Sequence, residues 1–158
     1  MSALLILLGT ALAQDCEGAT DCLAQGLDQA LVQEDDSLGE ALLARACGAG
    51  DELSCFHLAA TRLRLGQRVE VPASEPGLAE LKRRCEADQG RACLQLGLLH
   101  DKGPMGWRDM SQASMYFRQA CAAGQPEGCV QACDLGHAAS CAPAPLPPSA
   151  PQPADPGP

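Results

Sequence analysis

Residues 46–55 read ACGAGDELSC, and three later stretches of ten residues repeat the same pattern. In each stretch the second residue is a cysteine, and another cysteine closes the stretch after seven intervening residues. Three of the four stretches place a glycine three residues after the first cysteine, whereas the second stretch has an aspartate there. We call this pattern the cysteine block; its other copies are RCEADQGRAC (84–93), ACAAGQPEGC (120–129) and ACDLGHAASC (132–141).

The first three blocks stand between segments whose apolar residues recur at helical spacing. At the first block, one helix is expected to end where Gly50 adopts the left-handed conformation, and Asp51 opens the next helix. Ser37 is expected to cap the helix before this block, because Glu40 follows three residues later as in a capping box. Pro76 suits the first turn of a later helix. The expected helices span residues 20–33, 38–47, 51–65, 76–85, 91–100, 110–123 and 126–135.

A disulfide within each block follows from this arrangement. The first cysteine lies in the last turn of one helix and the second in the first turn of the next, so a tight turn brings their Cα atoms to roughly 5–6 Å. The expected pairs are Cys47–Cys55, Cys85–Cys93, Cys121–Cys129 and Cys133–Cys141, with a shortened copy, Cys16–Cys22, at the N-terminal end. Because Cys129 and Cys133 lie four residues apart on one helix face, a rearranged pairing or a labile thiol pair stays open.

The cysteines also indicate a compartment. Ten cysteines that pair by local spacing are typical of a disulfide framework formed in an oxidising environment. A metal site is the weaker interpretation, since the chain has no Cys-x-x-Cys sequence and its three histidines do not cluster. Free buried thiols are the other alternative. We therefore expect a periplasmic or secreted protein without a cofactor or a metal.

Both ends of the chain differ from the part that holds the cysteines. Residues 3–12 form an apolar run, and Ala-Leu-Ala at 11–13 matches the A-x-A pattern of a signal-peptidase cleavage site before Gln14. These features predict a signal peptide over residues 1–13; an ordinary apolar helix is the alternative. The apolar run is too short to span a bilayer. Residues 142–158, APAPLPPSAPQPADPGP, predict a disordered tail, either a spacer or a ligand for a proline-reading domain. The cysteine-rich domain is therefore expected over residues 14–141.

The composition excludes some partners. With a net charge of −9 and an isoelectric point near 4.6, the chain lacks the basic face that nucleic acids and anionic membranes require. Aromatic residues make up only 3%, which argues against an aromatic-lined pocket. Stable membrane insertion is not expected either, and a protein or peptide is the expected partner.

The spacing of the blocks predicts the architecture. Cys47 and Cys85 are 38 residues apart, and Cys85 and Cys121 are 36 residues apart. Repeats of this length with two helices each are typical of an α/α solenoid. The step from Cys121 to Cys133 is only 12 residues, as expected for a compressed terminal repeat. The expected fold is therefore an all-α solenoid of short helix hairpins, stapled by disulfides.

Two segments resemble the Sel-1-like repeat family, a relative of the tetratricopeptide repeat. Residues 113–136, ASMYFRQACAAGQPEGCVQACDLG, are similar to the family pattern A-x-x-x-F-x-x-A-x-x-G-x-x-x-A, with Cys129 at the last alanine. Residues 91–103, RACLQLGLLHDKG, are similar to A-x-x-x-L-G-x-x-(Y/H)-x-x-G. The cysteine spacing resembles the cysteine-rich subgroup that includes the Helicobacter cysteine-rich proteins. Ala59 and Asp88 depart from the pattern, since both stand where the family has glycine.

The resemblance implies a right-handed superhelix that binds proteins or peptides, without catalysis. Some members of the subgroup are described as binding or hydrolysing β-lactams, so a cell-envelope β-lactam-binding or β-lactamase-like hydrolase is the alternative function. The chain has neither Ser-x-x-Lys nor Lys-Thr-Gly, which serine β-lactamases need, and no histidine cluster for zinc. A thiol redox protein that uses Cys129 and Cys133 is the third hypothesis.

Few other residues are candidates for a functional site. Trp107 and Tyr116 are scarce aromatics on one repeat, where they serve either packing or binding. His57 and His100 are expected to be structural or on the surface. The acidic run at 34–36 is expected to begin a helix rather than to bind calcium, and the basic run at 82–84 to form an exposed helix face.

Overall fold

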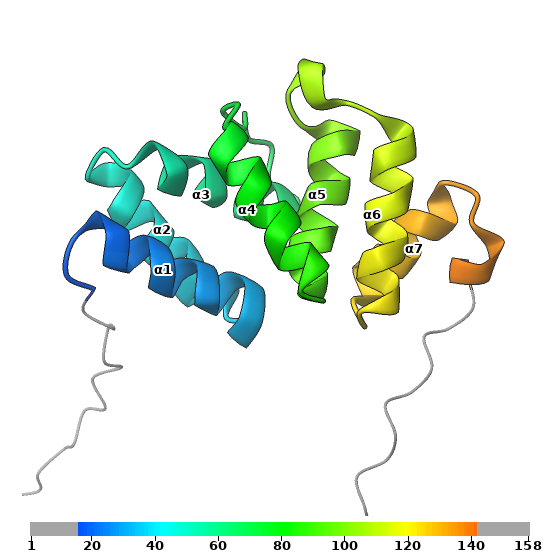
Figure 1. Cartoon of the computed structure of the whole chain (residues 1–158), viewed down its shortest axis with the longest axis horizontal. Coiled ribbons are helices and arrows are strands. Elements are labelled where there is room, and N and C mark those ends of the chain that lie inside the picture. Colours follow the sequence, from blue (N-terminus) through cyan, green and yellow to red (C-terminus); the bar gives the residue numbers. More distant parts are fainter. Residues whose placement is uncertain (1–15, 142–158) are drawn as a thin grey trace, which may run out of the picture.

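The computed structural model describes residues 16–141; the expected signal peptide (1–13) and proline-rich tail (142–158) lie outside these residues. The described part is all-helical and has no β-strand, which confirms the predicted all-α class. Its helices follow one another in chain order along the long axis of the molecule (Figure 1). They are α1 (Ala19–Asp28), the π-helix η1 (Gln29–Gln33), α2 (Asp36–Gly48), α3 (Glu52–Arg64), α4 (Glu75–Glu86), α5 (Gly90–Lys102), the 3₁₀ turn η2 (Met105–Trp107), α6 (Met110–Ala122), α7 (Pro126–Asp134) and the 3₁₀ turn η3 (Ala138–Cys141).

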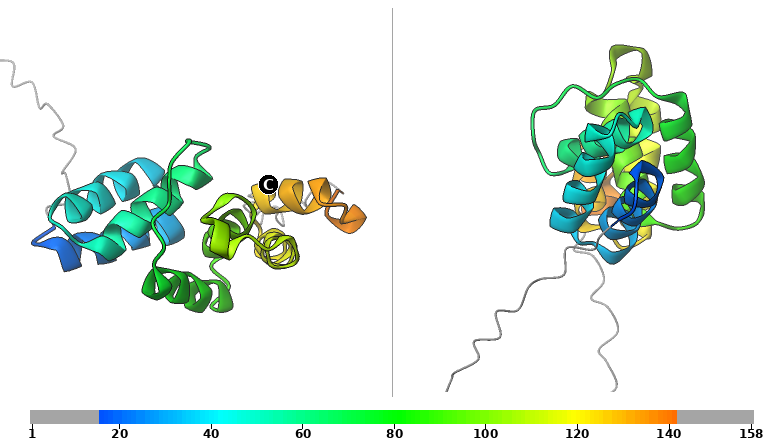
Figure 2. Two further views of the ribbon diagram at one scale, coloured as in Figure 1. Left: turned by 90° about the horizontal axis from the view of Figure 1, so that it is seen from above. Right: turned by 90° about the vertical axis from the view of Figure 1, so that its left-hand side faces the viewer.

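The helices pack as hairpins that stand side by side. Within the hairpins, α2 packs against α3, α4 against α5, and α6 against α7. Between them, α1 packs against α2, α3 against α5, and α5 against α6. Figure 2 shows the same row from above and from one end, with α1 and η3 at opposite ends of the molecule. The predicted helix bounds agree with the structure to within two residues, except that the helix expected over 20–33 is α-helical only to Asp28 and continues as the π-helix η1.

One hydrogen-bonded turn recurs in all four cysteine blocks. The carbonyl of the first cysteine accepts a hydrogen bond from the N–H three residues later, at 2.8–3.0 Å in the four blocks. The carbonyl of the preceding residue accepts from the N–H five residues later, which makes the pair of bonds of a Schellman motif. This motif needs one residue with positive φ, and the structure has Gly50, Asp88, Gly124 and Gly136 there, at φ values of 91°, 60°, 86° and 91°.

The turns hold each pair of cysteines at bonding distance. The Cα–Cα distances of the four blocks are 4.6, 4.7, 4.5 and 4.9 Å, at the short end of the range that a disulfide permits. All ten cysteines are paired, each with the partner that its block predicts. The rearranged pairing of Cys129 and Cys133 is therefore wrong in this structure.

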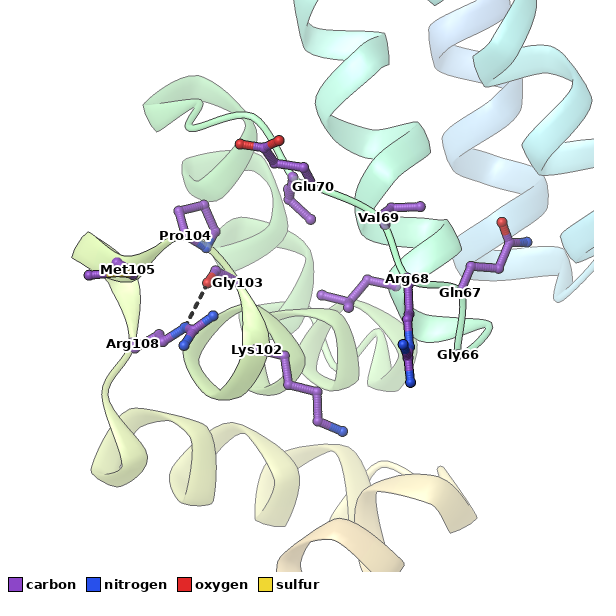
Figure 3. A pocket seen from close by; sticks show the side chains of 12 residues that line it. Gly66, Gln67, Arg68, Val69, Glu70, Lys102, Gly103, Pro104, Met105 and Arg108 are labelled. Atoms are coloured by element: carbon purple, nitrogen blue, oxygen red, sulfur yellow. Dashed lines mark hydrogen bonds between the residues drawn. The ribbon is translucent and has the colours of Figure 1, made fainter.

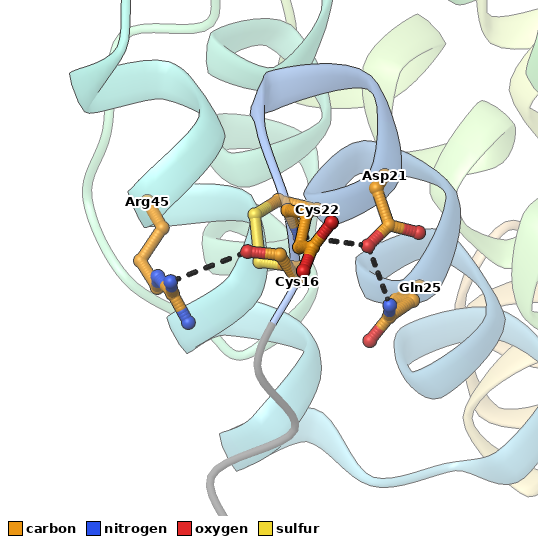
Figure 4. The surroundings of a disulfide bond; sticks show 6 residues. Cys16, Asp21, Cys22, Gln25 and Arg45 are labelled. Atoms are coloured by element: carbon orange, nitrogen blue, oxygen red, sulfur yellow. Dashed lines mark hydrogen bonds between the residues drawn. A yellow bond between two sulfur atoms is a disulfide. The ribbon is translucent and has the colours of Figure 1, made fainter.

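The shortened copy fastens the N-terminal end of α1. Cys16 and Cys22 are bonded with a Cα–Cα distance of 4.9 Å, and both are buried against α2. Figure 4 shows Arg45 of α2 donating a hydrogen bond to the Cys16 carbonyl at 3.4 Å. On the other side, the Asp21 carboxylate accepts from the backbone N–H of Glu17 at 2.9 Å. The segment before α1 is thus held by a covalent bond and by side chains from two helices.

The predicted capping box at the start of α2 is wrong. Asp35, rather than Ser37, caps the helix and accepts a hydrogen bond from the Leu38 N–H at 2.9 Å. Glu40 reaches away from the helix start and pairs with Arg62 of α3 at 2.7 Å. The helix begins two residues earlier than expected, because the Asp35 carboxylate accepts from a backbone N–H of the first turn and so acts as the cap.

Asp36 joins three parts of the fold. Its carboxylate binds two arginines, Arg64 at the end of α3 and Arg91 in the first turn of α5. Arg91 Nη1 lies 2.7 Å from Asp36 Oδ1 and also donates to the Ala30 carbonyl of η1 at 3.1 Å. Partial burial raises the pKa of Asp36, but the hydrogen bonds and positive charges of Arg64 and Arg91 outweigh that effect and hold the pKa below its ordinary value. This network fixes α5 against the first hairpin.

Two phenylalanines fill the core against glycines of neighbouring helices. Phe56 of α3 lies over Gly77 of α4, and Phe117 of α6 lies over Gly97 of α5. Both rings are fully buried. A Cβ atom built on Gly77 would lie 2.2 Å from the Phe56 ring, and one on Gly97 would lie 2.5 Å from the Phe117 ring. The helices approach this closely only because these positions carry no side chain.

His57 is a buried neutral base in the middle of α3. Its side chain is 1% exposed, and neither ring nitrogen has a hydrogen-bond partner in the described part of the chain. Burial lowers the pKa of His57 from 6.5 to about 4, against the raising effect of the Glu80 carboxylate. The structural role expected for His57 therefore involves a side chain that must be uncharged in the folded protein.

The substitution His57→Leu, which nearly conserves side-chain volume, is expected to remove an acid sensitivity. The unfolded chain protonates His57 near pH 6.5 and the folded chain near pH 4, so the free energy of unfolding falls as the pH drops between these values. A shift of this size corresponds to roughly 3 kcal/mol. Urea unfolding at pH 7, 5.5 and 4 measures it. Equal pH dependence of wild type and variant would contradict the prediction.

Candidate functional site

A groove lies between the connection from α3 to α4 and the connection from α5 to α6. One wall is the segment after α3, residues 66–71, and the other is the segment after α5, residues 102–108. The groove has a volume of about 760 Å³ (Figure 3). It is lined by Leu63, Gly66, Gln67, Arg68, Val69, Glu70, Val71, Lys102, Gly103, Pro104, Met105 and Arg108.

The first wall is a strap that the end of α3 directs outward. Gly66, at φ 77°, closes α3 with the same pair of hydrogen bonds that closes the cysteine blocks, although no disulfide follows it. The strap then runs without regular structure until Ser74 caps α4. Residues 68–73 make no hydrogen bond, by backbone or side chain, to any other described residue. Their backbone donors and acceptors are thus free for water or for a partner.

The second wall is fixed by contacts with α5 and α6 on the side away from the groove. Gly103 follows α5 where a Cβ atom would lie 2.3 Å from the Leu99 carbonyl oxygen. The chain then turns through η2, and the Trp107 carbonyl lies 2.7 Å from Nδ1 of the buried His100. The His100 ring stacks on Tyr116 with 5.5 Å between ring centroids. The wall is therefore anchored to α5 and α6.

The two aromatic residues singled out from the sequence do not line this groove. Trp107 is half-buried and meets the Phe56 ring edge-on, with 6.1 Å between centroids. Tyr116 is buried under His100 and borders a second cavity of about 900 Å³. Both side chains pack behind the second wall and support its position. The lining cations were missed, and their signal in the sequence was basic residues in the two longest connections.

The groove concentrates positive charge in an acidic protein. Three of its lining side chains are cationic (Arg68, Lys102 and Arg108), and one is acidic (Glu70). Figure 3 shows Arg68 on one wall, Lys102 and Arg108 on the other, and Glu70 on the side of the groove opposite Lys102. Arg108 donates a hydrogen bond to the Gly103 carbonyl at 2.9 Å, which holds its side chain against its own wall.

Most other arginines of the described chain are already paired. Arg62, Arg64, Arg83, Arg84 and Arg91 each bind a carboxylate. Within residues 16–141, neither Arg68 nor Arg108 has a carboxylate partner, and Lys102 has only its neighbour Asp101 at 3.6 Å. The groove cations therefore have coordination positions left for an external anion.

Aliphatic side chains form the more buried part of the groove lining. Val71 is buried, and Leu63 and Val69 are half-buried. Met105, which also lines the groove, has 85% of its surface exposed. Aliphatic side chains beside a few charged ones are the usual lining of a binding site, because the first give contact area and the second fix the orientation of the ligand.

Two other cavities are less suited to a charged ligand. In the 900 Å³ cavity beside Tyr116, the lining Lys82 stands against the acids Glu86 and Asp88. A cavity of about 460 Å³ between α1, α3 and α4 is mostly apolar, and Glu80 neutralises the arginines on its rim. Nothing in the described residues marks an occupant for either one.

One serine–histidine contact lies outside the groove. Ser114 Oγ and His137 Nε2 are in hydrogen-bond contact, which is the start of a nucleophile–base pair. No carboxylate of the described residues binds the other nitrogen of His137, and neither residue lines the groove. Among residues 16–141 there is no free cysteine and no group of three or more His, Cys, Asp or Glu placed to hold a metal ion.

No protein-family model, no curated protein and no solved structure matches the chain. The resemblance to Sel-1-like repeats therefore depends on the residues of the chain itself. None of the helices between residues 16 and 141 is long and apolar enough to cross a membrane.

Proposed function

We propose that this protein is a disulfide-stapled scaffold that binds a peptide segment of another protein in the groove between residues 66–71 and 102–108. The observation that carries the proposal is that, within residues 16–141, Arg68 and Arg108 of the groove have no carboxylate partner and residues 68–73 of the strap make no backbone hydrogen bond. A rigid wall opposite the strap lowers the entropy lost on binding, because only the partner and the strap must become ordered.

The wider architecture and setting are part of the same proposal. Stacked hairpins, each with the same closing turn, support an α/α solenoid with a right-handed superhelix and membership in the cysteine-rich subgroup of Sel-1-like repeats. Five disulfides support a periplasmic or secreted location, because such bonds persist in oxidising compartments. A binding role without catalysis fits a groove that is lined by cations and aliphatic residues and contains no nucleophile–base pair.

A photo-crosslinking experiment tests the site without assuming the charge of the partner. A library of random decapeptides is selected on the oxidised protein, and p-benzoylphenylalanine is placed at Met105 or, as a control, at Val130 of α7, which is 57% exposed. Enriched peptides are expected to crosslink at Met105 and not at Val130. Failure to enrich any peptide, or equal crosslinking at both positions, would refute the proposal.

A further inference from the structure

We propose that the groove selects an extended acidic segment, whose carboxylates bind Arg68, Lys102 and Arg108 while its backbone pairs with the strap. This inference rests on the peptide-binding function proposed above and names the chemistry of the partner.

Charge complementarity selects the acidic partner. The chain carries 20 acidic and 11 basic residues, so an acidic segment is repelled by most of its surface. Three cations and a single acid line the groove, and two of these cations are arginines. A guanidinium can bind a carboxylate through two parallel hydrogen bonds, which adds geometry as well as attraction.

The strap selects an extended conformation. Residues 68–73 leave consecutive N–H and C=O groups unpaired within the described chain, apart from the missing N–H of Pro72. An extended peptide can pair with the groups of alternate strap residues, as when a strand is added to the edge of a sheet. A helical peptide cannot, because its own backbone groups are already bonded.

The single acid of the lining limits where the carboxylates of the segment can lie. Glu70 and Lys102 stand on opposite sides of the groove, as Figure 3 shows. An acidic side chain of the bound segment is therefore favoured beside Lys102 and disfavoured beside Glu70. Apolar side chains of the segment can contact Leu63 and Val71.

Two pools of capped fluorescent decapeptides test the inference on the oxidised full chain. Every second position is Glu in one pool and Gln in the other, and the remaining positions are random. By fluorescence anisotropy, the Glu pool is expected to bind at least about tenfold more tightly than the Gln pool. The preference is expected to shrink between 50 and 500 mM NaCl, because salt screens exposed charges.

A matched pair of variants locates the effect. Arg68→Glu with Arg108→Glu is expected to abolish the preference for the Glu pool. Lys82→Glu with Arg118→Glu makes the same change in net charge on exposed helix positions outside the groove, and it is expected to change affinity by less than about threefold. Equal weakening by the two double variants would overturn the inference.

The remaining outcomes separate this inference from the function on which it rests. Binding of neither pool would overturn both. Equal binding of both pools, with crosslinking retained at Met105, would overturn the acidic preference and leave the peptide-binding function standing.

Two outcomes would identify another occupant of the groove. Displacement of the peptides by equimolar pyrophosphate would identify a simple anion site and overturn the inference. Tighter binding after removal of residues 142–158 would identify the chain's own tail as the occupant and also overturn it.

Discussion

Complete reduction of the five disulfides is expected to abolish cooperative thermal unfolding of this protein, or to lower its midpoint by more than about 20 °C. Closing a loop of about nine residues removes roughly 2.5 kcal/mol of chain entropy from the unfolded state. Five such loops together approach the whole stability of a typical domain, about 5–15 kcal/mol. Circular dichroism at 222 nm, with and without a phosphine reductant, measures the effect, and mass spectrometry after alkylation verifies ten free thiols.

Two double variants separate loop entropy from packing. The Cys85–Cys93 and Cys133–Cys141 bonds both span a sequence separation of 8, so their closure entropies are equal. Cys85 and Cys93 are buried in the core, whereas Cys141 is exposed. Replacing the first pair by alanine is therefore expected to destabilise the protein more than replacing the second, because it also leaves a cavity. Equal losses of stability in the two double variants would show that loop entropy alone accounts for the stabilisation that these bonds give. An unchanged unfolding midpoint after reduction would refute the stabilising role of the disulfides.

The cysteine blocks made the helix pairs predictable because they combine covalent chemistry with backbone conformation. A disulfide across nine residues is possible only if the chain reverses between the cysteines, and a residue with positive φ permits that reversal. Asp88 shows that the rule concerns conformation rather than glycine, since it adopts φ 60° in the same turn. Aspartate tolerates the left-handed region better than most side chains, so the block that lacks glycine keeps the same geometry.

The groove could not be predicted in the same way because its walls come from distant segments without periodicity. The sequence places Arg68 and Arg108 in two separate connections, and nothing local brings them together. That they line one groove depends on how α3 and α5 pack, and on the contact of His100 with the Trp107 carbonyl that folds the second wall back. Tertiary packing of this kind leaves no spacing pattern in the chain. The sequence instead pointed to the scarce aromatics Trp107 and Tyr116, which do not line the groove but pack behind its second wall.

The substitution Gly97→Ala is expected to destabilise the protein although alanine is the better helix former. Alanine in a helix interior gains about 1 kcal/mol over glycine. At Gly97, however, the new methyl group would lie 2.5 Å from two ring atoms of Phe117, which is fully buried and has no space to retreat. Overpacking of this kind costs about 1–3 kcal/mol, or more where the backbone must move. We therefore expect a lower midpoint in thermal or urea unfolding.

Two further variants test whether the contact between Gly97 and Phe117 is the cause. At Gly48, near the end of α2, no atom lies within 4 Å of an added Cβ, so Gly48→Ala is expected to be neutral or slightly stabilising. Adding Phe117→Leu to Gly97→Ala removes the ring and is expected to cost less than the sum of the two single changes. Strict additivity would show that the ring and the methyl group do not collide. The close approach of α5 and α6 would then need another explanation, although this approach carries the wall that presents Arg108 to the groove.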